Sequence, residues 1–210
     1  MATITGSEVL AKALRTQGVD TMFYLMGGPM LETESACIKL GVRAIDSRHE
    51  QGASMMAHAY SRLTRRPGVC MASSGPGTIN MATGVANAFI DAAPLIAVGG
   101  TSPRVYFGMD AFQEVDQLSL FKPITKWATR ILDAKRIPDV VATAFRQATS
   151  GRPGPVFLDL PGDILGEVSP YDPGIYATVI ALMIVVAIAA TLTPTRRALK
   201  VDPAAALRYE

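Results

Sequence analysis

The sequence predicts an α/β fold, a doubly wound parallel sheet with helices on both faces, followed by one C-terminal apolar helix of the transmembrane type. Three observations support this prediction. Short apolar segments alternate with segments whose apolar residues recur at helical spacing. Most of the short segments stop at glycine or small polar residues, where a helix then begins. After Ser169 and Pro170 the composition changes to a long uncharged stretch.

The first helix is expected over residues 7–17, because four apolar side chains share one face and Gly18 follows as a stop. Apolar runs that end at glycine, proline or polar clusters predict the strands. The same periodicity argument places the remaining helices, the last of which starts at Pro138. In chain order, strands are expected at 21–25, 42–45, 69–72, 94–98 and 154–160, and further helices at 31–40, 51–63, 79–90 and 137–148. Residues 101–126 are expected to be irregular or mixed.

The predicted domain organisation has four parts: a domain over residues 1–168, a junction over 169–174, an apolar helix over 175–193 and a basic tail over 194–210. The apolar run has nineteen residues without a charge. As a helix it would span about 28 Å, close to the hydrocarbon thickness of a bilayer. A buried core helix is the alternative, although the run has no polar face.

Location and topology are predicted separately for the two parts. No charged-then-apolar signal peptide precedes Thr5, so residues 1–168 are expected in the cytoplasm. The full chain is expected to associate with a membrane through residues 175–193. Arg196, Arg197 and Lys200 favour a cytoplasmic C-terminal side, which conflicts with a cytoplasmic domain before a single crossing.

Composition excludes some classes of function. The formal net charge of +2 gives no reason to expect nucleic-acid binding. Cys37 and Cys70 have no metal-type spacing, and Cys70 lies inside a predicted strand, so a buried free thiol is expected. His49 and His58 have no second cluster of metal ligands, so both are expected to be structural. No metal site is predicted in this chain.

Two predicted strand-to-helix corners lie close together in the chain, one at Glu50 and one at residues 73–77. Ligands of open parallel sheets bind at the carboxyl ends of strands, so Glu50 and residues 75–80 are expected to face one crevice. A structural explanation of Glu50 is also open. Ser47 and Glu50 match a capping box, and a carboxylate in the first turn stabilises a helix by roughly 0.3–1 kcal/mol.

Gly75, Pro76 and Gly77 lead into a helix and could cradle a phosphate on backbone N–H groups. They could equally form only a tight turn beside a helix–helix contact. The pattern is not a dinucleotide fingerprint, because Asn80 stands where the third glycine belongs. Gln113 and Glu114 lie in a polar loop and, taken alone, would face solvent.

Six pieces of the sequence, taken together, favour the functional interpretation of these residues. Residues 5–165 resemble the N-terminal, pyrimidine-binding domain of thiamine-diphosphate-dependent enzymes of the acetolactate synthase and oxalyl-CoA decarboxylase group. The pieces occur in that group's order and approximate spacing. They are Arg48-His-Glu-Gln-Gly-Ala53, Ser74-Gly-Pro-Gly-Thr-Ile-Asn80, Asn87-Ala-Phe-Ile-Asp-Ala-Ala-Pro94, Asp110-Ala-Phe-Gln-Glu114, Pro123-Ile-Thr-Lys126 and Gly154-Pro-Val-Phe-Leu-Asp-Leu-Pro161.

The resemblance implies roles for the candidate site residues. Glu50 is similar to the glutamate that hydrogen-bonds N1′ of the cofactor's aminopyrimidine, where a carboxylate helps the ring to take the proton from the thiazolium C2. Gln113 resembles a glutamine that approaches the reacting centre. Gly75, Pro76, Gly77 and Asn80 would shape the wall against the pyrimidine. The loop at 27–29 lacks a histidine that some members carry there, which leaves the substrate class open.

The resemblance also implies partners. In this group a middle domain and a diphosphate-binding domain follow, and the latter holds Mg²⁺ and the diphosphate of a neighbouring subunit's site. Nothing after Pro161 resembles either domain, so the chain is expected to be half of a site and inactive alone. It would need a homodimer or a partner chain that carries the diphosphate domain. The substrate would be a small 2-keto acid or an acyl-CoA-type compound.

Residues 171–210 have a different resemblance, to the last transmembrane helix and C-terminus of macrolide-exporter-type ABC-transporter permeases. The matching pieces include Thr193-Pro-Thr-Arg-Arg-Ala198 and Val201-Asp-Pro-Ala-Ala-Ala-Leu-Arg-Tyr-Glu210. Three hypotheses therefore stand. The chain is half of a thiamine-diphosphate-dependent enzyme, or a non-catalytic module that dimerises or binds a nucleotide-like ligand, or a chimeric or truncated frame fused to a permease C-terminus.

Overall fold

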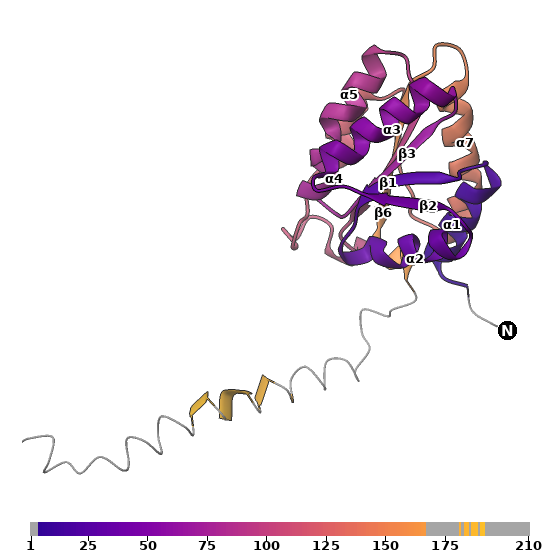
Figure 1. The fold of residues 1–210 in the computed structure, drawn as a ribbon. Helices are drawn as coiled ribbons and strands as arrows, with labels where there is room; N and C mark the ends of the chain where they lie inside the picture. Colours follow the sequence, from indigo (N-terminus) through magenta and orange to yellow (C-terminus); the bar gives the residue numbers. More distant parts are fainter. Residues whose placement is uncertain (1–3, 167–180, 182, 185, 189, 192–210) are drawn as a thin grey trace, which may run out of the picture. The chain divides into compact units, whose positions relative to one another are not determined.

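The structure, a computed structural model, describes residues 4–166 and positions 181, 183, 184, 186–188, 190 and 191. Within the first range six strands form one sheet in the order β2-β1-β3-β4-β6-β5, and every neighbouring pair is parallel (Figure 1). The strands are β1 Thr21–Leu25, β2 Arg43–Asp46, β3 Gly68–Ala72, β4 Leu95–Thr101, β5 Trp127–Arg130 and β6 Pro155–Pro161. Five of the six were expected from the sequence, whereas β5 was missed because its four residues are all half-buried and show no alternation.

The helices follow the predicted positions with three differences, one of which is a short helix at Gly162–Leu165 that was not expected. The helices are α1 Gly6–Thr16, α2 Leu31–Lys39, α3 Glu50–Thr64, α4 Pro76–Asn80, α5 Ala82–Ile90, α6 Gln117–Phe121, α7 Ile137–Thr149 and α8 Gly162–Leu165, with short 3₁₀ turns at Gly28–Met30, Arg104–Tyr106, Lys122–Ile124 and Ala134–Arg136. The helix expected over 79–90 is two helices, which start at Pro76 and Ala82 and meet at the buried Met81. The region expected to be irregular contains α6.

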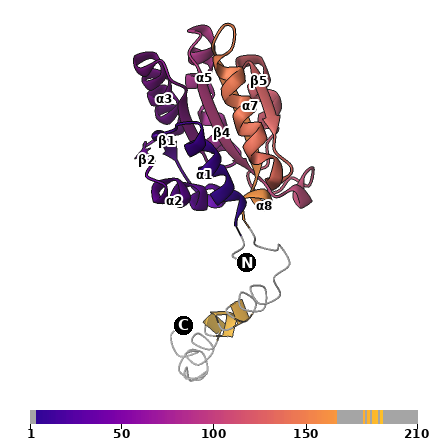
Figure 2. The ribbon, with the colours of Figure 1, turned by 90° about the vertical axis from the view of Figure 1, so that its right-hand side faces the viewer.

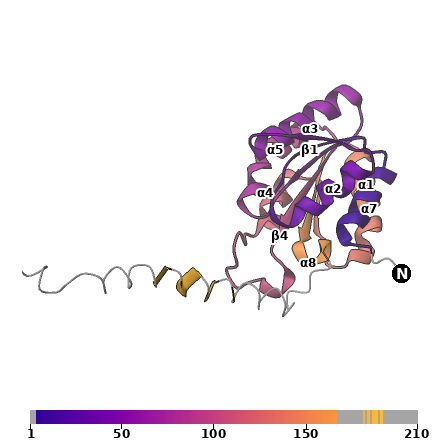
Figure 3. The same ribbon diagram turned by 60° about the horizontal axis from the view of Figure 1, so that its bottom comes forward.

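Helices cover both faces of the sheet, which confirms the doubly wound prediction. Helices α1, α2 and α7 pack on one face and α3, α5 and α6 on the other (Figures 2 and 3). Along β3 the side chains alternate: Val69 and Met71 join the first core cluster, and Cys70 and Ala72 join the second. All five residues of β3 are buried, as expected for a central parallel strand.

Small residues bring α5 against α3. A Cβ on Gly84 would lie 2.2 Å from Ser54 Oγ and 2.8 Å from the backbone nitrogen of Met55. These distances leave no room for a side chain, so the two helices approach closely only because position 84 is a glycine. This close packing fixes α3, whose first residue is Glu50.

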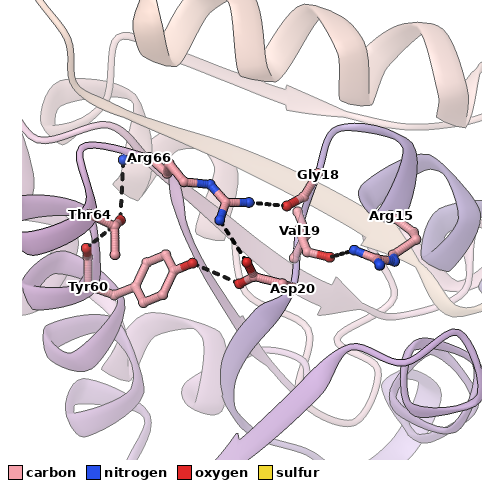
Figure 4. Close-up of polar contacts among 7 residues, drawn as sticks. All are labelled: Arg15, Gly18, Val19, Asp20, Tyr60, Thr64 and Arg66. Carbon is pink, nitrogen blue, oxygen red and sulfur yellow. Dashed lines mark hydrogen bonds and ion pairs between the residues drawn. The ribbon is translucent and has the colours of Figure 1, made fainter.

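The opposite end of α3 is anchored at the amino edge of the sheet (Figure 4). Tyr60 Oη donates a hydrogen bond to Asp20 Oδ1 at 2.8 Å, and Arg66 Nη1 donates to Asp20 Oδ2 at 2.7 Å. Arg66 Nη2 also donates to the carbonyl oxygen of Gly18. The Tyr60 hydroxyl, followed by the Arg66 guanidinium, holds the pKa of Asp20 below its usual range.

The chain divides into two units, Met1–Glu167 and Val168–Glu210. The predicted junction at 169–174 and the basic tail at 194–210 lie outside the described residues, as do most positions of the predicted apolar helix at 175–193. Its described positions between 181 and 191 are helical and exposed. Among the residues that the structure describes, no helix is long and apolar enough to cross a membrane.

Candidate functional site

The strand order predicts where a ligand would bind. From β1 the chain first winds outward to β2 and then returns to β3 on the other side of β1, so the winding direction changes between β1 and β3. Such a switch point leaves a crevice at the carboxyl ends of the strands. The loops after β1 and β3 meet there, since a Cβ on Gly27 would lie 3.4 Å from Ser73 Oγ.

Glu50 is the first residue of α3 and follows β2 at this edge. The capping-box interpretation is wrong, because the N-cap is His49, whose Nδ1 accepts a hydrogen bond from the Gln51 backbone N–H at 3.1 Å. Ser47 lies outside the helix and donates its hydroxyl to the carbonyl oxygens of Tyr24 and His49. The Glu50 carboxylate is therefore not used to cap its own helix.

The carboxylate of Glu50 instead meets the turn after β3. Its Oε2 accepts a hydrogen bond from Asn80 Nδ2 at 2.9 Å. Its Oε1 would lie 3.0 Å from a Cβ on Gly77, so the absence of a side chain there leaves space beside the carboxylate. The structure thus brings Glu50 together with residues 75–80, as the sequence predicts.

The turn itself depends on Gly75, which precedes Pro76 at the start of α4. Its φ of +57° and ψ of −118° form a conformation that residues with a side chain rarely adopt. The Gly75 N–H donates to Gln117 Oε1 at 3.1 Å. That N–H is engaged within the protein, so it is not offered to a phosphate as a cradle would require.

Gln113 packs against the same turn. Its Oε1 accepts a hydrogen bond from Ser74 Oγ at 2.9 Å, and its carbonyl oxygen occupies the space next to Gly75, 2.2 Å from where a Cβ would be. Gln113 holds a positive φ of 60°, which is uncommon for a residue with a side chain. Its side chain is half-buried and engaged, so the expectation that it faces solvent is wrong.

Glu114 is engaged as well and closes the loop that carries Gln113. Its carboxylate accepts the backbone N–H of Gly108 at 2.6 Å and that of Ala111 at 3.1 Å. These two hydrogen bonds, the Gly108 bond first, hold the pKa of Glu114 below its usual range. Glu114 is thus bonded within its own loop, while its side chain still lies partly at the surface.

A buried polar network behind the turn was not anticipated from the sequence. Gln117 is 0% exposed, and its Nε2 donates to the carbonyl oxygen of Gly100 and to Asp159 Oδ1, each at 2.8 Å. Asp159 Oδ2 accepts from Arg130 Nε at 2.5 Å, and the Arg130 guanidinium lies 4.5 Å from the centroid of the Phe107 ring. Burial raises the pKa of Asp159, against the opposing effect of Arg130 and Gln117.

Only part of this network had a signal in the sequence. An aspartate within the apolar run of β6 is an anomaly that could have pointed to Asp159, because buried charges need partners. Nothing in the sequence around Gln117 distinguishes it from an exposed polar residue.

The histidines make contacts within the fold, and the two cysteines are free and buried, as predicted for the cysteines. His49 caps α3, and His58 Nε2 lies 3.2 Å from Asp91 Oδ2, at ion-pair distance but outside hydrogen-bond geometry. Cys37 and Cys70 are buried free thiols. Burial raises the pKa of Cys37 to about 12 and that of Cys70 further. In the described part of the chain, no group of three or more His, Cys, Asp or Glu residues could hold a metal ion.

Comparison with known proteins identifies the family. Residues 4–120, more than half of the chain, match the family described as "Thiamine pyrophosphate enzyme, N-terminal TPP binding domain". The chain belongs to the thiamine pyrophosphate enzyme family. The resemblance that the six sequence pieces suggest is thereby confirmed for this domain. The resemblance of residues 171–210 to a permease stays a prediction.

Three curated relatives of this thiamine pyrophosphate enzyme domain illustrate the similarity. It is 42% identical over 160 residues to "Acetolactate synthase, chloroplastic" of Arabidopsis thaliana, a match covering 76% of this chain and 24% of the relative. It is 42% identical over 171 residues to "Acetolactate synthase isozyme 2 large subunit" of Escherichia coli, covering 80% of this chain and 31% of the relative. It is 44% identical over 159 residues to "Probable acetolactate synthase large subunit" of Methanocaldococcus jannaschii, covering 76% of this chain and 27% of the relative. The chain thus spans about a quarter to a third of these relatives.

The residues at this switch point have the chemistry that a flat heterocycle with ring nitrogens needs. A carboxylate with one oxygen already oriented by Asn80 can present its other oxygen, Oε1, to a ring nitrogen. The glycine at position 77 leaves the space next to that oxygen free of a side chain. The free carboxylate oxygen and the space beside it both suit a flat heterocycle.

Proposed function

We propose that residues 4–166 bind the aminopyrimidine end of thiamine diphosphate and form half of an active site of the acetolactate synthase type. The substrate of the complete site is a small 2-keto acid or an acyl-CoA-type compound. One observation carries the proposal: the Glu50 carboxylate is fixed by Asn80 and faces the space beside Gly77, at the switch point of the sheet.

Each side chain has a role in this proposal. Glu50 hydrogen-bonds a ring nitrogen and holds or releases a proton there, because a half-buried carboxylate is an acceptor that can also be protonated. Asn80 keeps the Glu50 carboxylate in one orientation. Gln113, held by Ser74, packs against the turn that carries Asn80 and presents its amide to the reacting centre. The bound cofactor supplies the electron sink for bond cleavage next to a carbonyl group.

The diphosphate end needs a second component. We propose that Mg²⁺ and the diphosphate are held by a separate diphosphate-binding domain, contributed by a partner chain. In support, the Gly75 N–H is bonded to Gln117 Oε1 and so is not offered to a phosphate. The isolated chain should accordingly show no turnover and only weak cofactor binding.

Isothermal titration and ¹H–¹⁵N spectra of the full chain with thiamine test the proposal. We expect weak binding that shifts the side-chain amide signals of Asn80. Glu50→Gln should weaken the binding at least tenfold, which corresponds to about 1.4 kcal/mol, without unfolding the protein. Glu32→Gln is the matched control, because Glu32 is also an acid in the first turn of a helix, α2.

If wild type and Glu50→Gln bind thiamine with equal affinity, Glu50 takes no part in the proposed site. A lower melting temperature of Glu50→Gln with unchanged binding would instead mean that its role is structural. Micromolar binding of thiamine diphosphate with Mg²⁺ by the single chain would contradict the proposal that the diphosphate site lies elsewhere.

We also propose that residues 175–193 place the full chain at a membrane. The proposal rests on their nineteen uncharged residues, which as a helix match the thickness of a bilayer's hydrocarbon core.

A further inference from the structure

Gln117 is a fully buried amide that joins three separate parts of the fold. It lies on the five-residue helix α6. Its two amide hydrogens go to the carbonyl oxygen of Gly100 at the end of β4 and to Asp159 on β6. Its oxygen accepts the N–H of Gly75 in the turn after β3. A buried amide with all of these bonds made stabilises one geometry, because each bond lost would leave a buried polar group unpaired.

The chemistry of its partners fixes which way the amide points. The Gly100 carbonyl and the Asp159 carboxylate are acceptors, so they require the NH₂ group, and the Gly75 N–H requires the oxygen. A flipped amide would place like groups against each other at all three contacts. Arg130, which donates to the other oxygen of Asp159, holds that side chain in its acceptor form. The orientation of Gln117 therefore follows from its partners.

The turn that Gln117 holds contacts both proposed catalytic side chains, one on each side. On one side, α4 starts directly after Gly75 and ends at Asn80, which donates to Glu50. On the other, Ser74 donates to Gln113 Oε1. A rotation of the Gly75 peptide would move both contacts together.

We propose that Gln117 is a positioning residue that sets Glu50 and Gln113 through the Gly75 turn. The inference deepens the proposed function and rests on it for its catalytic meaning, but the geometric coupling can be measured without ligand. A purely structural role would differ: loss of Gln117 would then lower stability and leave the orientation of Asn80 and Gln113 unchanged.

Two variants of the full chain separate these roles. Gln117→Met keeps the length of the side chain and removes all its hydrogen bonds. Gln117→Glu keeps an oxygen for the Gly75 N–H, and burial beside Asp159 favours its protonated form, which can still donate once. Val141→Ala on α7 is the control, because it opens a small cavity in the core cluster of the other sheet face and so lowers stability away from the turn.

The readout is the position of the Asn80 and Gln113 side-chain amide signals in ligand-free ¹H–¹⁵N spectra. We expect Gln117→Met to shift both pairs, Gln117→Glu to return them toward wild type, and Val141→Ala to leave them in place. Unchanged signals in Gln117→Met, or equal shifts in the Met and Glu variants, would overturn the proposal.

If Gln117→Met does not fold, hydrogen exchange of the Gly75 amide in the wild-type chain tests the bond through which Gln117 would hold the turn. We expect exchange at least about 100-fold slower than in an unfolded peptide, because the amide is bonded to a buried acceptor. An unprotected Gly75 amide would refute the proposal.

Titration with thiamine then tests whether the geometry of the Gly75 turn affects binding at the proposed site. Gln117→Met should bind about tenfold more weakly than wild type, and Gln117→Glu within about threefold of it, following the amide shifts. If wild type does not bind thiamine, the proposed function fails, while the ligand-free spectra still judge the positioning role. If thiamine binds equally to both variants and wild type, the positioning role fails and the proposed function stands.

Discussion

Replacing Gly75 by alanine is the sharpest test of how the turn and the loop that carries Gln113 fit together. The added Cβ would meet the Gln113 carbonyl oxygen at 2.2 Å and its carbon at 2.9 Å. Backbone atoms cannot rotate away as a flexible side chain can, so the loop must shift by more than half an ångström. The residue would also have to keep a φ of +57°.

The expected loss of stability has two parts. Holding a residue with a side chain in this backbone conformation costs about 1–3 kcal/mol. Forcing an extra carbon into a packed site costs about 1–3 kcal/mol more. Gly151→Ala is the comparison variant, because Gly151 has nearly the same φ, +58°, and no atom within 4 Å of an added Cβ, so it lacks the steric part. The effect of Gly→Ala on the unfolded chain is common to both variants and cancels.

Urea unfolding of wild type and both variants measures the difference. We expect Gly75→Ala to lose about 1–3 kcal/mol more than Gly151→Ala, which moves the midpoint by about 1 M at a typical denaturant slope. The Asn80 side-chain signals should shift in Gly75→Ala alone. Equal losses in the two variants, within about 0.5 kcal/mol, would refute the close contact between Gly75 and Gln113.

Three further predictions concern other parts of the chain. Arg130→Met should destabilise the protein by about 3–5 kcal/mol in urea unfolding, because it leaves the buried Asp159 carboxylate without its cation; a loss below 1 kcal/mol would contradict this. Asp20→Asn should lower the melting temperature more at pH 7 than at pH 3: the folded-state pKa of Asp20 is lowered, so its contribution is fully present above its ordinary pKa of 3.8 and declines as the pH falls toward the folded value. An equal difference at both pH values would exclude this ion-pair role. In a flotation assay the full chain should rise with lipid vesicles, and the double variant Ile184→Lys, Ile188→Lys should not. A wild-type chain that stays in the lipid-free bottom fraction would refute membrane binding.

The juxtaposition of Glu50 and Asn80 could be predicted from the sequence because it needs only the order of elements. Once strands alternate with helices, all carboxyl ends lie at one edge, and the residues just after each strand must meet there. The exact contact is a consequence of close packing at Gly77 and Gly84.

Other features depended on contacts between distant residues. Gln117 and Gly75 are 42 residues apart, and no local pattern links a glutamine on a short helix to a glycine turn. The capping-box prediction failed because two residues competed for one position: His49 supplies the cap, and Ser47 uses its hydroxyl as a donor to the end of β1. Such competition is decided by tertiary geometry, which local spacing does not contain.

The place of β6 in the sheet has a consequence for the order in which the protein can fold during synthesis. Within residues 4–166, β5 lies at the edge of the sheet and pairs only with β6, which follows it in the chain and inserts between β4 and β5. A growing chain that ends before residue 155 therefore has no neighbour for β5 and leaves one side of β4 without its partner. Because Asp159 lies on β6, the Gln117 bond to it forms only once this strand is in place. Ribosome-bound chains should thus become resistant to protease, and should acquire a protected Gly75 amide, only after β6 has left the exit tunnel.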